Sequence, residues 1–361
     1  MLTTTIAAPA RLAEEDRPRQ VRARTLDERM SVVGAFAGSF ALVWLLYLQI
    51  LPFSGILGFL VLWYATFLAM YAWVSARSNP RPIVVDRVMG AVIYGAAAVV
   101  GFALLTTLVF TFVRGFHAVS QPNFYTHSMS GVGPADPLNH GGILHAIVGS
   151  LIQLGIAVVV SLPLGIGTAI FLTEVGGRFG ALVRTVIEAM TAIPDLLAGL
   201  FVYVTLIVAL GQARTGFAAA VALSVTMTPI IARSAEVALR VVPGGLREAG
   251  QALGASQWQT VRRVVLPTAR PGLATAMILA MARGVGETAP LLIVSGASTF
   301  LNHDPFHNPM NSLPLFIFAG ARSGQPNFIA RAFGAATVLL AVVFVLFVIT
   351  RLLARPRLVR R

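Results

Sequence analysis

The chain has 361 residues, of which 57% are hydrophobic and only 11% are charged, and its mean hydropathy is +0.80. This excludes an ordinary soluble domain, in which about 25% of the residues are charged. The net charge of +13 comes from arginine alone, and the absence of lysine and cysteine excludes a Walker-type ATPase, thiol catalysis and cysteine-bound metals.

Several apolar stretches are long enough to cross a bilayer, which takes about 20 mostly apolar residues. Each stretch is continuous rather than alternating, which indicates helices and not the strands of a barrel. The predicted fold class is therefore all-α, a polytopic transmembrane helical bundle of about eight spans. The predicted spans are 32–51, 54–76, 88–113, 143–173, 183–211, 216–238, 268–299 and 331–353.

The arginines indicate how these spans are oriented. Most of them fall on one side of the predicted bilayer, and Arg283 lies within a span. By the positive-inside rule, the arginine-rich side is cytosolic, so both termini are expected in the cytosol. A nucleic-acid patch is the weaker alternative, because no soluble module with interleaved aromatic residues is present. The arginines on the opposite side are Arg114, Arg214, Arg322 and Arg331.

The chain divides into four predicted segments. Residues 1–31 read as a cytosolic tail rather than a signal peptide, since their charges are spread out and no small-residue cleavage site follows. Two spans at 32–76 form an additional hairpin. The linker 77–87 contains two prolines and three arginines, which predicts a cytosolic break before the remaining domain, 88–361.

Two outer loops, at about 114–142 and 300–330, contain five of the six histidines. His303 and His307 have the spacing of a metal-binding pair on a helix, but Pro305 between them indicates a loop. A polar surface that docks a partner is the favoured interpretation, and no metal site is predicted.

The cytosolic segment 242–267 has the pattern of two short amphipathic helices. Gly254 suits the left-handed residue that ends the first helix, and Ser256 with Gln259 forms a capping box that starts the second. Pro267 is then expected to open the seventh span. The alternative on these features alone is an interfacial helix that lies on the bilayer.

The same segment resembles the coupling loop of ABC importer permeases, E-A-A-x-x-x-G-x9-I-x-L-P. Glycine replaces the third residue of that motif and valine its isoleucine. The resemblance implies a type I importer permease core whose loop 242–267 docks on a separate ATPase chain. The matching residues that would couple to the ATPase are Glu248, Ala249, Gly254, Leu266 and Pro267.

More of the chain, from about residue 86 to 361, resembles the PstA-type phosphate permeases. The most specific match is "RGVGETAPLL", residues 283–292. The resemblance implies a transport subunit, not an enzyme, in a bacterial plasma (inner) membrane. Its implied partners are a second related permease, two copies of an ATP-binding subunit and an extracytoplasmic phosphate-binding protein. No cofactor is expected on this chain, and ATP–Mg is expected on the ATPase.

Other functions stay open at this point. A permease for another oxyanion, such as phosphonate, sulfate or molybdate, would share the coupling loop. A transporter or channel that works without an ATPase, or a membrane scaffold whose charges are purely structural, would need no such partner.

Arg283 is the main candidate for the substrate path. It lies sixteen residues after Pro267, or about 24 Å along a helix, where a charge must face the bundle interior or a wet cavity. Glu287, one turn further on, is expected to neutralise it. We expect the guanidinium to bind phosphate in transit, with Glu287 as its counter-charge, although a pair that only fixes helix packing is the alternative. Gly284 and Gly286 are expected to leave room for close helix approach.

Two further residues complete the predicted path. Arg233, in "TPIIARS", is the second candidate arginine, and an interfacial arginine without a transport role is a nearly equal alternative. Thr288, next to Glu287, is included as a neighbouring polar side chain.

Overall fold

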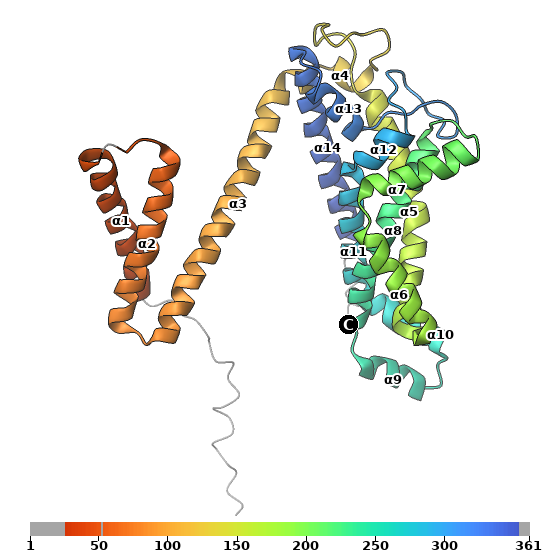
Figure 1. Cartoon of the computed structure of the whole chain (residues 1–361). Helices are drawn as coiled ribbons and strands as arrows, with labels where there is room; N and C mark the ends of the chain where they lie inside the picture. Colours follow the sequence, from red (N-terminus) through yellow and green to blue (C-terminus); the bar gives the residue numbers. More distant parts are fainter. Residues whose placement is uncertain (1–25, 52, 354–361) are drawn as a thin grey trace, which may run out of the picture. The chain divides into compact units, whose positions relative to one another are not determined.

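The computed structural model describes residues 26–51 and 53–353, and the regular elements within these ranges are all helical (Figure 1). This confirms the predicted all-α fold class. The predicted tail, 1–31, lies almost wholly outside the described residues. The chain forms two compact units, Met1–Thr106 and Thr107–Arg361, and the boundary falls within helix α3, Arg81–Val119.

The first unit is a helical hairpin followed by the first part of α3. Helix α1, Leu26–Trp44, continues as the π-helix η1, Leu45–Ile50, and packs against α2, Ile56–Ser78. Its small core consists of Ala35, Phe67 and Tyr71. Only Asn79 and Pro80 separate α2 from α3, so most of the expected linker 77–87 is helical.

The second unit is a bundle built around α8, Gly216–Arg240. This helix is rich in alanine, and most of its residues are buried among the other helices. It packs chiefly against α5, Leu144–Ile170, and α11, Leu266–Gly286. The remaining elements are α4, Asn123–Thr126; η2, Phe171–Val175; α6, Gly177–Ala192; α7, Asp195–Val202; η3, Tyr203–Ala209; α9, Gly244–Ala252; α10, Gln257–Thr260; η4, Val261–Val265; α12, Ala289–Val294; α13, Leu313–Ala321; and α14, Pro326–Leu353.

Within the described ranges, seven helices are long and apolar enough to cross a membrane, and a bent pair gives an eighth span if it is counted as one. The prediction of about eight spans is therefore confirmed. The expectation of one uninterrupted span at 183–211 is wrong, since α6 and the helix 195–209 meet at 103°. Pro194 explains the bend, because a residue before proline is pushed out of the helical region and Ile193 is extended, with φ −72° and ψ 128°.

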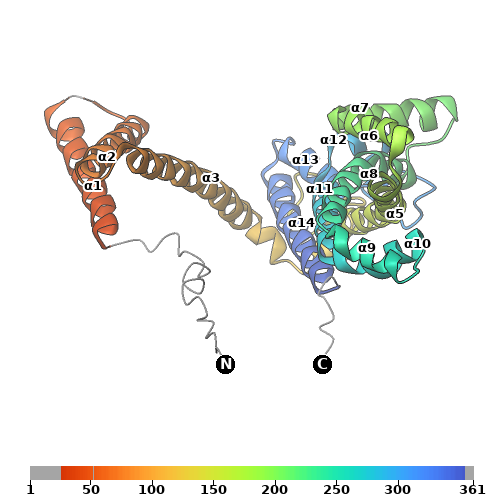
Figure 2. The same ribbon diagram turned by 90° about the horizontal axis from the view of Figure 1, so that it is seen from below.

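The two ends of the second unit differ. At one end, α4 and α13 lie beside the outer loops, and the buried Arg331 of α14 holds the first of these loops. Its Nη2 donates to the carbonyls of Asp136, Pro137 and His140 at 3.1, 2.6 and 2.8 Å. At the other end, α9 lies across the bundle (Figure 1), and in the view from that end α9 and α10 are side by side (Figure 2).

Candidate functional site

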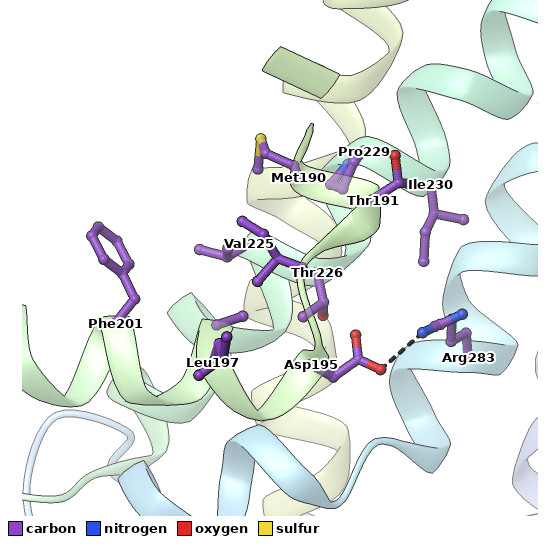
Figure 3. A pocket seen from close by; sticks show the side chains of 12 residues that line it. Met190, Thr191, Asp195, Leu197, Phe201, Val225, Thr226, Pro229, Ile230 and Arg283 are labelled. Atoms are coloured by element: carbon purple, nitrogen blue, oxygen red, sulfur yellow. Dashed lines mark hydrogen bonds and ion pairs between the residues drawn. The ribbon is translucent and has the colours of Figure 1, made fainter. Parts of the chain in front are cut away.

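Arg283 lies in the last turn of α11 and binds two carboxylates. Its Nε donates to Glu287 Oε1 at 3.1 Å, and its Nη2 donates to Asp195 Oδ2 at 2.8 Å (Figure 3 shows the bond to Asp195). The predicted pairing with Glu287 is confirmed. Asp195 was missed, because 88 residues separate it from Arg283 and no spacing rule joins them. Its signal in the sequence is a carboxylate directly after Pro194 in an otherwise apolar stretch.

The chain around Glu287 is not the continuous helix that was expected at 268–299. Helix α11 ends at Gly286, Glu287 is extended with φ −67° and ψ 125°, and α12 begins at Ala289. Pro290 explains the break, because its ring clashes with the carbonyl four residues earlier, at Gly286, and it has no N–H to donate. Glu287 thus reaches Arg283 from the end of the helix and not from its face.

A close contact between α7 and α12 fixes the position of Asp195. A Cβ at Gly199 would lie 2.5 Å from Pro290 Cα, so only glycine lets these two helices approach so closely. Asp195 opens α7, where a negative charge interacts favourably with the helix dipole. Gly284 supports the other side, because a Cβ there would lie 2.6 Å from Met227 Sδ on α8, as expected. The expectation of a close helix approach is wrong for Gly286, because a Cβ added there would meet no atom of the described residues within 4 Å.

Asp195 and Arg283 line a cavity of about 440 Å³ between α6, α7, α8 and α11 (Figure 3). The volume is in the range of small-ligand pockets. Its wall is mostly apolar with a few polar groups, the composition that orients a small polar ligand. The other lining residues are Met190, Thr191, Ile193, Leu197, Ala198, Phe201, Val225, Thr226, Pro229 and Ile230.

The guanidinium of Arg283 keeps donors available in this cavity. Its side chain is 53% exposed, whereas those of Asp195 and Glu287 are 31% and 12% exposed. Nε and Nη2 are occupied, and Nη1 makes no hydrogen bond within the described part of the chain. An arginine fork with a free side suits an oxyanion, which accepts several hydrogen bonds in one plane.

Arg233 is not among the residues that line this cavity, although Ile230, one turn earlier on α8, is. Its Nη1 lies 3.4 Å from Glu236 Oε2 and 3.5 Å from Glu188 Oε1. Glu236, a residue that the sequence reasoning missed, is buried and also binds Arg184 of α6 at 2.9 Å and Arg240 at 2.6 Å. We refer to Glu236 with Arg184, Arg233 and Arg240 as the Glu236 cluster.

Thr288 does not line the cavity either. Its hydroxyl donates to the carbonyl of Gly286 at 3.4 Å, and its side chain does not cap α12. In the second outer loop, His307 Nδ1 lies 2.6 Å from Asp304 Oδ2, and no metal-binding group of three side chains occurs among the described residues.

The predicted coupling loop forms helix α9 and a turn. Glu248 and Ala249 are exposed on α9, Gly254 has φ +83°, and the capping box of Ser256 and Gln259 is present. These features agree with the predictions. Pro267 lies in the first turn of α11, Leu266–Gly286, as predicted, although the helical run already begins at Gln257. The π-helical turn η4 precedes Pro267 and accommodates a residue that lacks an N–H.

One side chain of α9 ties this loop to the bundle. Arg247 donates from Nη2 to Glu174 Oε1 at 3.0 Å and to the Leu239 carbonyl at 3.0 Å, and from Nη1 to the Val242 carbonyl at 2.7 Å. Gln257 Nε2 also donates to the backbone carbonyl of Glu174. Arg247 therefore joins α9 to the end of η2 and to the C-terminal end of α8, where a cation is favourable.

These features are those of a multi-pass helical membrane protein with an exposed helix and turn, α9 and Gly254, at one end of its bundle. Residues 161–358 match the family "Binding-protein-dependent transport system inner membrane component". The chain belongs to this family and is the permease subunit of an ABC importer, a class that works with a binding protein and an ATPase.

Two relatives and one solved structure show how far the similarity extends. The chain is 41% identical to "Phosphate transport system permease protein PstA 1" of Mycobacterium tuberculosis (strain ATCC 25618 / H37Rv), over 64% of this chain and 74% of the relative. It is 33% identical to "Phosphate transport system permease protein PstA" of Haemophilus influenzae, over 71% of this chain and 89% of that relative. A solved structure of a bacterial alginate ABC transporter shares the fold, with a TM-score of 0.52 at 14% identity. The superposition covers 76% of this chain and 96% of the transporter chain.

Proposed function

We propose that this permease carries inorganic phosphate into the cytoplasm, driven by ATP hydrolysis on a separate chain. The observation that supports it best is the Arg283 guanidinium on the wall of a mostly apolar cavity of about 440 Å³. The names of the relatives supply the ligand, since both are phosphate transport permeases.

Phosphate would bind Arg283 by exchange. In the structure, Asp195 and Glu287 occupy two sides of one guanidinium, which gives the group a formal charge of −1. An incoming oxyanion would bind Nη1 first and then compete with the carboxylates for the other donors. Because the two carboxylates pair with the guanidinium between substrates, its positive charge is tolerated at membrane depth.

The same carboxylates give a basis for selectivity. Phosphate near neutral pH keeps at least one proton, whereas sulfate has none. A P–OH group can donate to Glu287 or Asp195, while sulfate would place oxygen against carboxylate oxygen. A site built to pair with a donor rejects a ligand that lacks the donor, because its own polar groups stay unpaired.

Arg233 would act after Arg283, closer to the arginine-rich side of the membrane. It is half exposed, at 52%, and its two carboxylate contacts are long, at 3.4 and 3.5 Å. A loosely held arginine can give up its partners to an anion that leaves the cavity. Thr288 would have no direct contact with the substrate. Its hydroxyl would only bind the Gly286 carbonyl where the chain leaves α11.

Energy would enter through α9. The exposed Glu248 and Ala249 would contact the ATPase, and Arg247 would pass the displacement of α9 to α8, whose Thr226 and Ile230 line the cavity. The assembly would contain a second related permease and two copies of an ATP-binding subunit that holds ATP–Mg. This chain itself would bind no cofactor and catalyse no reaction.

The arginine-poor side would face the phosphate-binding protein. The outer loops 114–142 and 300–330 are held in place, the first by Arg331 and the second by the N–H of Phe217, which donates to the Pro305 carbonyl at 2.7 Å. A fixed loop is suited to docking, because little ordering entropy is lost. Both termini would then lie in the cytosol of a bacterial plasma membrane.

The test is uptake of labelled phosphate by the reconstituted complex with its ATPase and binding protein, with sulfate as competitor. We expect ATP-dependent uptake that excess sulfate leaves unchanged. Arg283→Lys keeps the charge but loses the fork, so its uptake should fall, while Arg214→Lys, an exposed arginine outside the cavity, should match the wild type. Equal competition by sulfate or phosphonate would indicate another oxyanion, and uptake without ATP would indicate a transporter of another class.

A further inference from the structure

The first unit, which lies outside the residues matched by the family, contains a hollow of about 830 Å³, which is larger than the cavity at Arg283. It lies between α1, α2 and the first part of α3. Its volume falls within the range of pockets that bind small ligands. We call it the hairpin groove.

The hairpin groove has a charged end and an aromatic end. Arg29 on α1 and Arg87 on α3 line the first, and Phe36 and Tyr94, each seven residues further along the same helix, line the second. Seven residues are two helical turns, or about 10 Å. The groove therefore changes from ionic to apolar over the depth at which a bilayer changes from headgroups to acyl chains.

Aromatic side chains hold the walls apart. The Tyr64 hydroxyl of α2 donates to the Ala91 carbonyl of α3 at 3.1 Å, and its ring crosses to α3 where a Cβ at Gly95 would lie 2.1 Å from the hydroxyl oxygen. Phe67 contacts Phe36 edge-on, with ring centroids 5.7 Å apart. At Gly90 an added Cβ would meet no atom within 4 Å, so the groove is open there.

The charged end is basic. The segment 77–87 contains three arginines, Arg77, Arg81 and Arg87, and one acidic residue, Asp86. Arg29, which also lines the groove, follows Asp27 and Glu28 in the sequence, so the arginines exceed the acids by four to three. A basic pocket between membrane helices on the cytosolic side is the kind of site that binds an anionic lipid headgroup. By the positive-inside rule, this end belongs to the cytosolic leaflet.

We propose that the hairpin groove binds one anionic phospholipid of the cytosolic leaflet. Its headgroup would contact Arg29 and Arg87, and one acyl chain would lie along Phe36, Tyr64 and Tyr94 beside Gly90. The additional hairpin thus adds a lipid-binding unit to the permease. This assignment is independent of which oxyanion the second unit carries.

The test uses the full-length chain in detergent, stripped of lipid and titrated with phosphatidylglycerol or phosphatidylcholine of the same acyl chains, with bound lipid counted by native mass spectrometry. We expect one retained phosphatidylglycerol. Arg29→Gln with Arg87→Gln should weaken its binding roughly thirtyfold and leave phosphatidylcholine unchanged, since each basic residue near an anionic lipid contributes about fivefold in affinity.

Two glycine variants test the location. Gly90→Leu fills the groove, whereas Gly101→Leu places the same side chain on the same helix, where a Cβ is equally unobstructed but outside the groove. We expect Gly90→Leu to lose the lipid and Gly101→Leu to keep it, with equal helix content by circular dichroism. Equal retention by the two variants, or equal affinity for both lipids, would overturn the proposal and leave the groove to ordinary bilayer lipid or a partner helix. The arginine variants decide the matter if Gly90→Leu does not fold.

Discussion

Two clusters of charge in the second unit have opposite compositions. At the cavity, one arginine is held by two carboxylates, Asp195 and Glu287. In the Glu236 cluster, one carboxylate is held by three arginines, with Glu188 as a second, looser acid. The formal charges sum to −1 for Arg283 with its two carboxylates, and to +1 for the Glu236 cluster together with Glu188. The central side chain is a cation, Arg283, in the first group and an anion, Glu236, in the second.

The burial of the two central groups differs as well. The Glu236 side chain is 3% exposed and that of Arg283 is 53% exposed. A buried carboxylate that links α6 to α8 cannot give up its close partners Arg184 and Arg240 without a large desolvation cost, whereas a guanidinium on a cavity wall can exchange its partners. We infer that the Glu236 carboxylate mainly holds helices together and that Arg283 mainly binds substrate.

The largest expected effect on stability comes from removing the central anion. Glu236→Ala should lower the free energy of unfolding by about 3 kcal/mol, near the lower limit for breaking a buried pair, because its arginines are partly exposed. Thermal unfolding of the purified chain in detergent measures it. Glu188→Ala, at a side chain that is 54% exposed, is the control and should cost below about 1 kcal/mol. Equal losses for the two variants would remove the distinction between the clusters.

Removing the central cation should affect transport more than stability. Arg283→Gln should reduce phosphate uptake by the assembled complex roughly 10- to 100-fold, as for the loss of a hydrogen bond to a charged group. Its unfolding temperature should fall less than that of Glu236→Ala. The comparison fails if Arg283→Gln unfolds the chain as readily as Glu236→Ala while uptake per folded complex is unchanged.

The two carboxylates beside Arg283 can be separated by substitution. Glu287→Gln and Asp195→Asn each remove one negative charge but keep a side chain of the same size. We expect both to admit sulfate as a competitor of phosphate uptake, with the stronger effect at Glu287, which is the more buried of the two. Competition assays on the complex measure this. Selectivity that stays intact in both variants at normal uptake would contradict the proposed role of the carboxylates.

A smaller effect is expected at the link between α9 and the bundle. Arg247→Lys keeps the charge facing Glu174 but loses the fork that also binds two carbonyls of the α8 end. We expect several-fold fewer phosphate ions transported per ATP, with the ATPase still bound. The ratio of uptake to ATP hydrolysis measures it. Arg263→Lys, an exposed arginine after the turn, should behave as the wild type, and an unchanged ratio in Arg247→Lys would exclude the link.

Local sequence signals predicted those parts of the site that depend on neighbouring residues. Arg283 and Glu287 are only four residues apart, so their contact was expected, although Glu287 makes it from beyond the end of α11 and not from the same helix face. The capping box at Ser256 and the left-handed Gly254 are likewise set by a few adjacent residues. The predictions failed where proline competes with apolar continuity, since hydropathy does not register the missing N–H of Pro194 or Pro290.

The sequence by itself determined that this is a multi-pass helical membrane protein with a helix–glycine–helix segment at 242–267, because apolar length and turn chemistry act locally along the chain. Only the tertiary structure decided which carboxylates meet which arginines. Asp195 reaches Arg283 because the chain bends by 103° between α6 and α7 and because Gly199 lets α7 lie against Pro290. Contacts between residues 88 positions apart depend on that packing, and no local periodicity encodes it.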